Sequence, residues 1–390
     1  MNKHFLYLLA LAHLSVDINS GSIAAILPFF VQYYGMDYTD VAGLMFASSF
    51  LSSVIQPLFG WLADRGSRQW FMPLGVLLVS ISLGSTGFLT NYWAIFAAVT
   101  LMGIGSAIFH PEAARNVNVV SGTQRGQGMS IFSVGGNGGF GLGPLLAVFL
   151  ISTFGMEGTA FYAAFGIVMS IVLLFVLPHI RRAAAPTKSA TNPSEPQENM
   201  RIENDWPAFG RLSLVILFRS TVFTGLSSFL PLYCIHVLGS SAAVGSGTLS
   251  IISLTGIVAT LVGGRLADRK GYVYTLRLAC SMLVPCLAVT AFSGSIWGIY
   301  AILIPMSFAM QMPYSSIVVL GQSYLAKNVG FASGITLGVS FSIGGIVVPS
   351  LGQYADRFGL ESLMALLVVL SFCAALATFL LSQPKDQRCV

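Results

Sequence analysis

The feature that most constrains this chain is a succession of long apolar stretches that follow one another along almost its whole length. A helix needs roughly 20 apolar residues to cross the hydrocarbon layer of a bilayer, and the stretches reach that length. Only 8% of the 390 residues are charged, whereas a soluble domain carries roughly 25%. A surface so poor in charge cannot face water on all sides, so lipid must surround most of it. The sequence therefore predicts an all-α protein that crosses a membrane many times.

Glycine, proline, asparagine and clusters of charged residues divide the apolar stretches into twelve predicted transmembrane helices. The predicted helices cover residues 4–34, 38–63, 70–89, 92–117, 127–153, 158–181, 208–238, 242–266, 272–293, 296–325, 329–354 and 360–382. The N-terminal segment opens with Lys3 and His4 and then turns apolar, as a signal peptide would. However, it is too long for that role and lacks a cleavage pattern of small residues, so we expect it to remain as the first membrane span.

The basic residues predict the orientation of the chain, because Lys and Arg favour the cytoplasmic side of a membrane. Of the 19 Lys and Arg residues, Arg219 falls inside a predicted helix and Arg357 on the outer side, which leaves 17 at the cytoplasmic ends. Both termini are then cytoplasmic, and we expect a bacterial inner-membrane protein. Residues 183–206 are polar and broken by prolines, so they predict a flexible linker between bundles at 1–182 and 207–390.

Four short segments of the first half recur in the second half at offsets of 204, 203, 202 and 205 residues. The pairs are Gly60-Trp-Leu-Ala-Asp64-Arg65 with Gly264-Arg-Leu-Ala-Asp268-Arg269, Ala25-Ile-Leu-Pro28 with Ser228-Phe-Leu-Pro231, His110-Pro111-Glu112 with Met312-Pro313-Tyr314, and Gly143-Pro144 with Val348-Pro349. An even number of helices in each half makes this a parallel repeat, whose axis lies along the membrane normal. We therefore expect two pseudo-symmetric six-helix bundles that enclose a central cavity where they meet.

The segment Gly60-x-Leu-Ala-Asp-Arg-Gly-Ser-Arg68, with its second copy at 264–271, resembles the signature loop of the major facilitator superfamily. The glycine-rich segment 135–144 is similar to the antiporter motif of its drug-exporting members. Within the superfamily the chain most resembles the fosmidomycin-resistance transporters, on His13-Leu-x-x-Asp17, Gly103-x-Gly-Ser-x-x-Phe-His110-Pro-Glu112 and Ser130-Ile-Phe-x-Val-Gly-Gly-Asn137. The resemblance implies the two-bundle major facilitator fold and transport by alternating access.

The repeated loops are candidates for a conformational latch between the two halves. An aspartate at a helix end can accept hydrogen bonds from the backbone N–H groups of the next helix and can pair with a neighbouring arginine. The alternative is a solvated ion pair in a basic loop, which contributes only about 0–1 kcal/mol. The residues assigned to a latch of the outward-facing state are Gly60, Asp64, Arg65, Arg68, Gly264, Asp268, Arg269 and Arg115.

Asp17 lies near the middle of the first predicted helix, and thus near the middle of the membrane. A carboxylate is costly there unless it is paired or protonated, which makes Asp17 a candidate site for a transported proton. His13 precedes it by four residues and lies on the same helix face. The pair is either a proton site or a structural hydrogen-bond network, and we favour the proton site.

A second polar group is expected in the fourth helix, near the cytoplasmic mouth of the cavity. Pro111 removes a helical hydrogen bond and bends this helix. We expect His110, Glu112 and Arg115 to cluster beside the bend. Glu112 and Arg115 are three residues apart and so can pair along one helix face. We favour a proton relay or gate that includes His110 and Glu112 over a simple neutralising ion pair.

Arg219 lies near the middle of the seventh predicted helix, within one residue of the position that repeats Asp17. The family resemblance also implies a basic residue there. Because an arginine keeps its charge, it needs an anion, which either Asp17 supplies across the cavity or an anionic substrate supplies. Both can act in turn, since a substrate that displaces Asp17 leaves that carboxylate free to protonate. Such a competition would couple the proton to the substrate.

Other polar and aromatic residues are expected to complete the substrate cavity, with the two amides as the strongest candidates because they lie in apolar helices. They are Asn137, Gln311, Tyr33, Tyr34, Tyr233 and Tyr314. The glycines of 135–143 lie in a membrane helix, so we expect close helix packing there and no phosphate site. Pro111, Pro144 and Pro349 are expected to bend helices that rock during alternating access.

The five cysteines and five histidines predict neither a disulfide nor a metal site. The cysteines form no CxxC pair, four of them lie in or beside apolar segments, and the histidines show no metal-ligand spacing. No GxSxG motif or nucleophile and base constellation indicates an enzyme. We therefore expect no enzymatic activity and no cofactor.

The expected function is secondary active transport by a monomer, driven by an ion gradient because the chain shows no nucleotide-binding domain for ATP. The favoured hypothesis is proton-coupled export, by antiport, of a small anionic or amphiphilic compound such as an antibiotic. The alternative is proton-coupled uptake, by symport, of a sugar, organic acid or other metabolite. A membrane sensor without transport is a remote alternative, since no soluble domain is predicted. The expected partners are a small-molecule substrate, protons and lipid, and no nucleic acid.

Overall fold

The computed structural model describes residues 1–65, 70–184 and 203–384. Regular structure in these ranges is entirely helical, as the all-α prediction requires. Arg68 of the expected latch and most of the expected linker lie outside the described residues.

The first half folds into six long helices. They are α1 (Lys3–Tyr34), α2 (Tyr38–Arg65), α3 (Phe71–Ser85), α4 (Tyr92–Ser121), α5 (Arg125–Phe154) and α6 (Ala160–Ala184), with 3₁₀ turns η1 (Thr86–Phe88) after α3 and η2 (Gly155–Thr159) before α6. Local sequence sets several of their ends. The side chain of Asn91 caps α4 by accepting hydrogen bonds from the N–H groups of Trp93 and Ala94. Gly35 ends α1 in the left-handed conformation, with φ of 66°.

The second half follows the same plan, with two differences from the predicted helices. It contains α7 (Trp206–His236), α8 (Ala242–Lys270), α9 (Tyr272–Phe292), α10 (Ile296–Gln311), α11 (Tyr314–Tyr324) and α12 (Val329–Phe379). The predicted helix 296–325 is interrupted at Pro313, which has no N–H group to donate. Helix α12 covers the last two predicted helices and turns at Gly359, where φ is 85°. With α10 and α11 taken together and α12 taken as two helices, the described residues contain the twelve predicted helices.

Length and composition suit these helices to a membrane. Ten runs of the described residues are long and apolar enough to cross one, and a shorter apolar helix covers Val329–Gly338. The longest run, Arg125–Ile180, holds both α5 and α6. Many large apolar side chains are exposed, among them Trp93, Phe175 and Phe372, as expected for surfaces that face lipid. The protein is therefore a multi-pass membrane protein.

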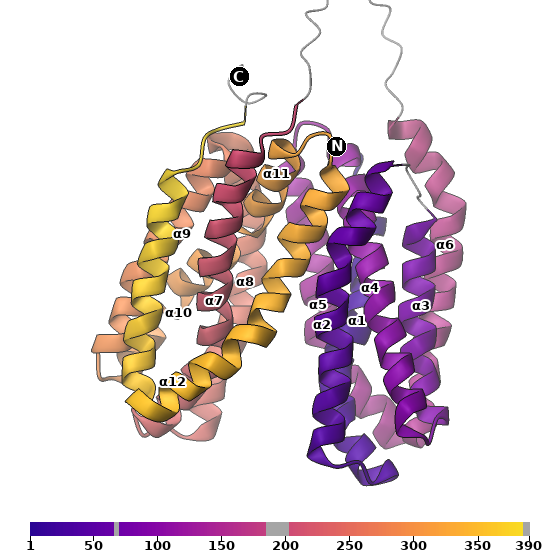
Figure 1. Cartoon of the computed structure of the whole chain (residues 1–390), viewed down its shortest axis with the longest axis horizontal. Coiled ribbons are helices and arrows are strands. Elements are labelled where there is room, and N and C mark those ends of the chain that lie inside the picture. Colours follow the sequence, from indigo (N-terminus) through magenta and orange to yellow (C-terminus); the bar gives the residue numbers. More distant parts are fainter. Residues whose placement is uncertain (66–69, 185–202, 385–390) are drawn as a thin grey trace, which may run out of the picture.

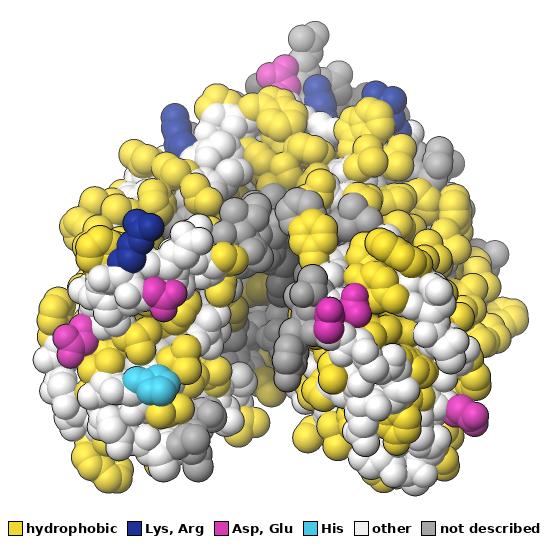
Figure 2. Space-filling model, turned by 60° about the horizontal axis from the view of Figure 1, so that its bottom comes forward, with side chains coloured by type: hydrophobic (Ala, Val, Ile, Leu, Met, Phe, Trp, Pro, Cys, Tyr) yellow, Lys and Arg dark blue, Asp and Glu magenta, His cyan; other side chains and the backbone are white. Residues whose placement is uncertain are grey.

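The helices form two bundles, α1 to α6 and α7 to α12, that stand side by side (Figure 1). The N-terminus and the end of α12 lie at the same end of the molecule, which we call the terminus end (Figure 1). The bundles meet there, where α2 contacts the start of α12 and α8 contacts the start of α5. At the opposite end they diverge, and Figure 2 shows that face hollowed between two lobes. A central cleft therefore opens away from the termini.

Within the first bundle, α1 and α5 pack so closely that their backbones touch. A Cβ atom on Gly139 would lie 2.7 Å from the nitrogen of Ile18, and one on Gly143 would lie 2.5 Å from its carbonyl oxygen. Gly135 abuts the carbonyl group of Ala10 in the same way. The glycine-rich segment therefore serves close helix packing, as predicted, and brings the middle of α5 against the middle of α1.

Candidate functional site

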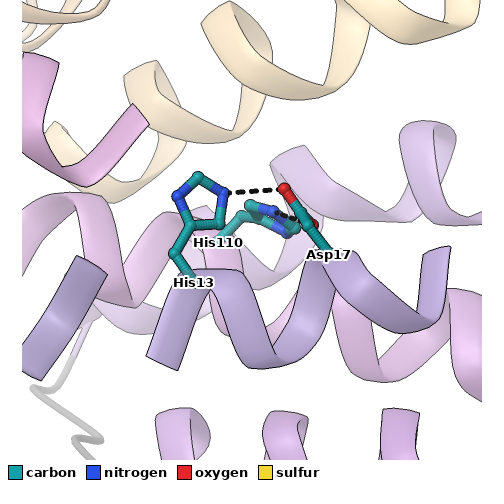
Figure 3. A group of neighbouring side chains, drawn as sticks. All are labelled: His13, Asp17 and His110. Atoms are coloured by element: carbon teal, nitrogen blue, oxygen red, sulfur yellow. Dashed lines mark ion pairs between the residues drawn. The ribbon is translucent and has the colours of Figure 1, made fainter. Parts of the chain in front are cut away.

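Three titratable side chains meet beside the middle of α1, two from α1 itself and one from α4. The Nε2 atom of His13 lies 3.0 Å from one carboxylate oxygen of Asp17, and the Nε2 atom of His110 lies 3.3 Å from the other (Figure 3). The exposed fractions of the side chains of His13, Asp17 and His110 are only 4%, 6% and 13%. We call these three residues the His–Asp–His cluster. The predicted contact between His13 and Asp17 is present, and His110 joins it from another helix.

Backbone carbonyl groups fix the orientation of both histidine rings. The Nδ1 atom of His13 lies 2.8 Å from the carbonyl oxygen of Phe132 on α5, and that of His110 lies 2.8 Å from the carbonyl oxygen of Ser106 on α4. A carbonyl oxygen only accepts hydrogen bonds, so each Nδ1 must carry the donated hydrogen. The ring of His13 also stacks on that of Phe132, with centroids 4.0 Å apart. Both Nε2 atoms are therefore held toward Asp17.

This geometry sets how many mobile protons the cluster can hold. With hydrogen on Nδ1, a neutral histidine presents a lone pair at Nε2, and a carboxylate also presents only lone pairs. Each contact between an Nε2 atom and a carboxylate oxygen is therefore a hydrogen bond only when a proton lies between them. Two protons satisfy both contacts and give the cluster a single positive charge, whereas its charge is negative once both have left. The charge of the cluster therefore depends on how many protons lie between these atoms.

Gly136 of α5 makes room for the cluster. A Cβ atom at this position would lie 2.6 Å from Nε2 of His13 and 2.7 Å from a carboxylate oxygen of Asp17. Any larger residue would push into both side chains. Sequence reasoning treated this glycine only as a packing residue and did not single out Phe132. The available signal was that both lie in the segment 130–137, which resembles the fosmidomycin-resistance group.

Arg219 is the charged residue that α7 places inside the second bundle. One of its Nη atoms donates a hydrogen bond to the carbonyl group of Met310, while its buried Nε atom has no hydrogen-bond partner among the described residues. None of the three ion pairs between described residues includes Arg219. The pairing of Arg219 with Asp17, one of the two expected alternatives, is therefore not seen. The reason is that Asp17 is already paired with two histidines.

Tyr314 of α11 lies between the two charged sites. Its phenol group is near both Asp17 and Arg219, and it lies close to Ser133 of α5. Tyr314 therefore lies where the two bundles meet, with an acidic group toward one bundle and a basic group toward the other. This places one predicted substrate residue between the predicted proton site and the predicted anion site.

Glu112 occupies a different face of α4 from His110, and the two do not form the expected cluster. Residues two apart on a helix point about 200° apart, because each residue turns the helix by about 100°. Thus His110 reaches Asp17, whereas Glu112 accepts a hydrogen bond from Asn116 and lies 3.9 Å from Arg115. One buried carboxylate oxygen of Glu112 has no hydrogen-bond partner among the described residues. Its part in proton transfer stays a prediction.

At the terminus end, two aspartates join the bundles by the same contact. The carboxylate of Asp64, in the last turn of α2, accepts hydrogen bonds of 2.7 and 2.8 Å from the N–H groups of Gly330 and the next residue. The carboxylate of Asp268, near the end of α8, accepts bonds of 2.7 and 2.8 Å from Gly126 and the next residue. The side chain before each capped helix makes no such bond itself. Each aspartate therefore caps α12 or α5 of the other bundle, and not the next helix in sequence.

Glycines allow the backbones to approach closely at these two contacts. A side chain on Gly60 would collide with Gly330, and a Cβ atom on Gly264 would lie 2.5 Å from the carbonyl oxygen of Gly126. The two glycines of the predicted latch therefore bring each aspartate within reach of the helix that it caps.

The arginines of the predicted latch take other positions. The guanidinium of Arg65 lies 3.7 Å from the ring centroid of Trp61, so it stacks on that ring and does not pair with its neighbour in sequence. Arg115 donates a hydrogen bond of 3.0 Å to the carbonyl group of Ala63 and so ties α4 to the end of α2. Arg269 is exposed at the end of α8.

A hydrogen bond between Asn118 of α4 and Gln322 of α11 also joins the bundles. The two residues are 204 positions apart, which is the offset that relates Asp64 to Asp268. In α4 and α11 the repeat offset is 202, which relates Pro111 to Pro313, so Gln322 lies two residues beyond the position equivalent to Asn118 and the contact lies close to the pseudo-two-fold axis. Sequence reasoning missed this pair, although two amides near the repeat offset were a signal for it.

Two of the predicted substrate residues lie away from the cleft or at its edge. Tyr233 is buried in the core of the second bundle, with its hydroxyl group 3.5 Å from the carbonyl oxygen of Ala291 on α9. Its side chain is therefore buried in this structure, and its part in substrate binding stays a prediction. Tyr33 is exposed in the last turn of α1, at the end opposite the termini.

The two amides and the three prolines lie inside helices, as predicted. Asn137 is exposed on α5, one turn beyond Ser133 and on the same face, which approaches Tyr314. Gln311 ends α10 and packs against Gly256 of α8. The prolines inside α4, α5 and α12 are Pro111, Pro144 and Pro349. Their part in bending during transport stays a prediction.

A family model described as Major Facilitator Superfamily matches residues 9–349 of the chain. The uncharacterized MFS-type transporter YfnC of Bacillus subtilis is 27% identical over 98% of this chain and 93% of its own length. The fosmidomycin resistance protein of Escherichia coli is 26% identical over 95% of this chain and 91% of its own. The multidrug resistance protein MdtG of Dickeya zeae is 25% identical over 86% of this chain and 87% of its own.

Solved structures share the architecture. The transporter FucP, crystallised in the outward conformation, has a TM-score of 0.72 and 17% identity, over 97% of this chain and 98% of its own. The human organic anion transporter MFSD10 has a TM-score of 0.72 and 18% identity, over 97% of this chain and 99% of its own. At such identities the likeness establishes the fold alone.

Proposed function

The chain belongs to the major facilitator superfamily, and on that premise we propose that it exports a small anionic or amphiphilic compound, such as an antibiotic, in exchange for protons. It is a transporter and not an enzyme, as the family and the fold establish. The proposed setting is the inner membrane of a bacterium, with the terminus end in the cytoplasm and the protein working as a monomer. The cleft then opens to the outside, and alternating access moves it to the cytoplasmic side.

The observation that carries this proposal is a partly buried arginine that pairs with no anion among the described residues. Among the described residues, the Nε atom of Arg219 has no hydrogen-bond partner and no carboxylate pairs with its guanidinium. A guanidinium cannot lose its charge, and an unpaired charge in apolar surroundings is costly. An anionic substrate that accepts hydrogen bonds from Arg219 removes this cost. Asn137, Gln311 and Tyr314 are the proposed neighbours of that substrate.

The His–Asp–His cluster is the proposed proton site. Its two contacts need two mobile protons, so its charge changes sign as those protons come and go. Tyr314 interacts with the charges of both Asp17 and Arg219, which links the two sites across the bundles. Protonation of the cluster therefore alters the electrostatic potential that an anion at Arg219 experiences. This coupling through charge takes the place of a direct displacement of Asp17 by the substrate.

The direction of transport is proposed from two relatives. One relative is named for resistance to fosmidomycin and the other for multidrug resistance, and export is how a transporter confers resistance. Exchange for protons further requires that the bundles switch with either the substrate or the proton bound, but not with both.

The charge of the site favours a second candidate, which is uptake of an organic acid together with protons. The doubly protonated cluster and Arg219 are both positive, so a proton and an anion strengthen each other's binding. Mutual strengthening is what a symporter requires. The two candidates therefore differ in the direction of proton flow and not in the residues that they use.

The aspartate contacts are proposed to hold the cleft open to the outside. They close the cytoplasmic end by capping α12 and α5, and both caps must break before the cleft can open inward. The segments 1–182 and 207–390 are proposed to move as two bodies joined by the linker 183–206. The prolines at positions 111, 144 and 349 are proposed to allow the bending that this movement needs.

A proton-flux measurement tests the proposal and separates the two candidates. Purified protein is placed in liposomes that contain a pH-sensitive dye, the membrane potential is clamped, and fosmidomycin or another small phosphonate is added outside. Antiport makes the lumen alkaline as the substrate enters, whereas symport makes it acidic. Proton movement that depends on none of the phosphonates, organic acids or amphiphilic drugs offered would contradict proton-coupled transport.

Two substitutions separate the proton site from the anion site. Asp17→Asn is expected to lower proton-driven accumulation by about tenfold or more while substrate exchange continues, since exchange needs no net proton transfer. Arg219→Gln is expected to weaken substrate binding by about tenfold or more, because a hydrogen bond to a charged group contributes about 1.5–3 kcal/mol. The control is Arg211→Gln, an exposed arginine on the same helix. Normal substrate binding by the Arg219→Gln protein would refute the anion site.

A further inference from the structure

We propose that the His–Asp–His cluster is also a binding site for a divalent transition-metal ion, with Zn²⁺ as the representative ion. The protein ligands are Nε2 of His13, Nε2 of His110 and a carboxylate oxygen of Asp17. The fourth position is filled by water or by an anion. This goes beyond the proposed function, which uses the cluster for protons alone. It also departs from the sequence, in which the spacing of the histidines predicts no metal site.

The ligand atoms already have nearly the spacing that a metal ion requires. Bonds of about 2.0–2.1 Å at tetrahedral angles place neighbouring ligand atoms about 3.3 Å apart. The two distances between an Nε2 atom and a carboxylate oxygen are 3.0 and 3.3 Å (Figure 3). All three ligand atoms lie within 4.8 Å of one another. The two short distances go to different oxygens of the carboxylate, so a ring must move or the carboxylate must turn for both histidines to share an ion held by one oxygen.

The hydrogen bonds made by the other ring nitrogen of each histidine are those expected of metal-binding histidines. A histidine that binds a metal through one ring nitrogen donates the hydrogen of the other to a carbonyl or carboxylate, which fixes the tautomer and the ring. Both rings meet this condition, since the Nδ1 atoms of His13 and His110 lie 2.8 Å from the carbonyl oxygens of Phe132 and Ser106. Stacking on Phe132 further holds the ring of His13. Both Nε2 atoms are thus held against the carboxylate of Asp17 in advance.

A divalent ion carries the same charge as the two protons that it replaces in the cluster. Without mobile protons the cluster has one negative charge, so a dication gives it the same positive charge as two protons do. Metal binding must therefore release protons, and low pH must oppose it. Tyr314 of α11 is the further titratable group close to Asp17, and Arg219 of α7 is the charged group beyond it. Arg219 cannot titrate, so the proton competition comes from the cluster itself.

The ligand set selects the kind of ion. Two imidazole nitrogens and one carboxylate oxygen suit Zn²⁺, Co²⁺ and Ni²⁺, whereas Mg²⁺ and Ca²⁺ favour sites made entirely of oxygen. His110 is the least buried member of the cluster and gives the ion its approach. A bound ion occupies the lone pairs that receive protons, so Zn²⁺ is also expected to inhibit proton-coupled transport.

Calorimetric titration of the purified full-length protein with Zn²⁺ tests the site. One ion per chain is expected to bind at about pH 8, and at least about tenfold more weakly at about pH 6, because protons compete for the ligands. His13→Gln and His110→Gln are each expected to weaken binding by about tenfold or more. The matched controls are His179→Gln and His236→Gln, which alter exposed histidines and are expected to leave binding unchanged. Mg²⁺ is expected not to compete.

Absence of Zn²⁺ binding by the unaltered protein overturns the proposal, as does binding that persists in either cluster variant. Thermal unfolding shows whether each variant is folded. If a cluster variant is unfolded, the absorption spectrum of the unaltered protein with Co²⁺ tests the metal site instead. Four-coordinate Co²⁺ absorbs far more strongly in the visible range than six-coordinate Co²⁺, so a weak spectrum overturns the proposal as well. These measurements involve no transport, so their failure leaves the proposed function standing.

Discussion

At the scale of single residues, the site depends on backbone groups as much as on the three titratable side chains. Two carbonyl groups fix the rings of His13 and His110, and a glycine leaves the space that both His13 and Asp17 fill. The two carbonyl groups and the glycine are not titratable themselves. They determine that both Nε2 atoms face one carboxylate, which is the arrangement that the proposed proton site requires.

Substitution of Gly136 by alanine is expected to disable the cluster. The added Cβ atom would lie 2.6 Å from Nε2 of His13, and overpacking of this kind costs about 1–3 kcal/mol. Because the ring of His13 is held by Phe132, the strain falls on its contact with Asp17. Proton-driven accumulation in liposomes is expected to fall by about tenfold or more, and the thermal unfolding midpoint is expected to drop.

The control for this prediction is Gly141→Ala, which alters the same helix. A Cβ atom on Gly141 meets nothing within 4 Å, so this variant is expected to transport normally. Equal transport by the two variants would show that Gly136 does not support the cluster.

At the scale of helices, each bundle supplies the N-terminal cap of one helix in the other bundle. Asn91 and Asp205 cap α4 and α7 within their own bundles. The starts of α5 and α12 have no cap of this kind and receive theirs from Asp268 and Asp64 in the opposite bundle. An N-terminus without a cap leaves backbone N–H groups unsatisfied and a partial positive charge exposed. These caps therefore stabilise the arrangement in which the bundles touch at the terminus end.

Removal of either cap is expected to shift the protein toward the inward-open state. Loss of an N-cap side chain costs about 0.5–2 kcal/mol, so Asp64→Ala or Asp268→Ala should each lower the ratio of outward-open to inward-open protein by about two- to thirtyfold. Distances between spin labels placed across the terminus end measure that ratio. Asp205→Ala is the matched control, because Asp205 caps α7 within one bundle with a bond of 3.0 Å to the N–H group of Ala208. An equal shift in the Asp205→Ala protein would show that Asp64 and Asp268 do not act as a latch.

At the scale of the whole molecule, the repeat brings corresponding parts of α4 and α11 together close to the pseudo-two-fold axis. Asn118 of α4 and Gln322 of α11 bond directly there. Gln322 also donates a hydrogen bond to Ser333, so the axis contact is part of a buried polar network. The proposed alternating access requires the bundles to separate at the terminus end, so on that proposal this contact breaks in each cycle.

A covalent link across the axis is therefore expected to stop transport. In a protein whose native cysteines are replaced, Asn118→Cys combined with Gln322→Cys provides two thiols at neighbouring positions. A short bifunctional thiol reagent that a reductant can cleave is expected to abolish turnover almost completely, and the reductant should restore it. Each single-cysteine variant serves as the control for the reagent. Full transport by the linked protein would mean that the bundles do not separate along this axis.

The twelve helices, the two-bundle repeat and the contact between His13 and Asp17 could be predicted from the amino-acid order alone. These follow from continuous segments and from spacing along one helix, where apolar length and a separation of four residues suffice. The folded chain was needed to see that His110 joins Asp17, that Glu112 does not, and that Arg219 pairs with no anion among the described residues. Those outcomes depend on how separate helices are rotated and packed. No local pattern fixes that rotation, because it results from contacts made over the whole fold.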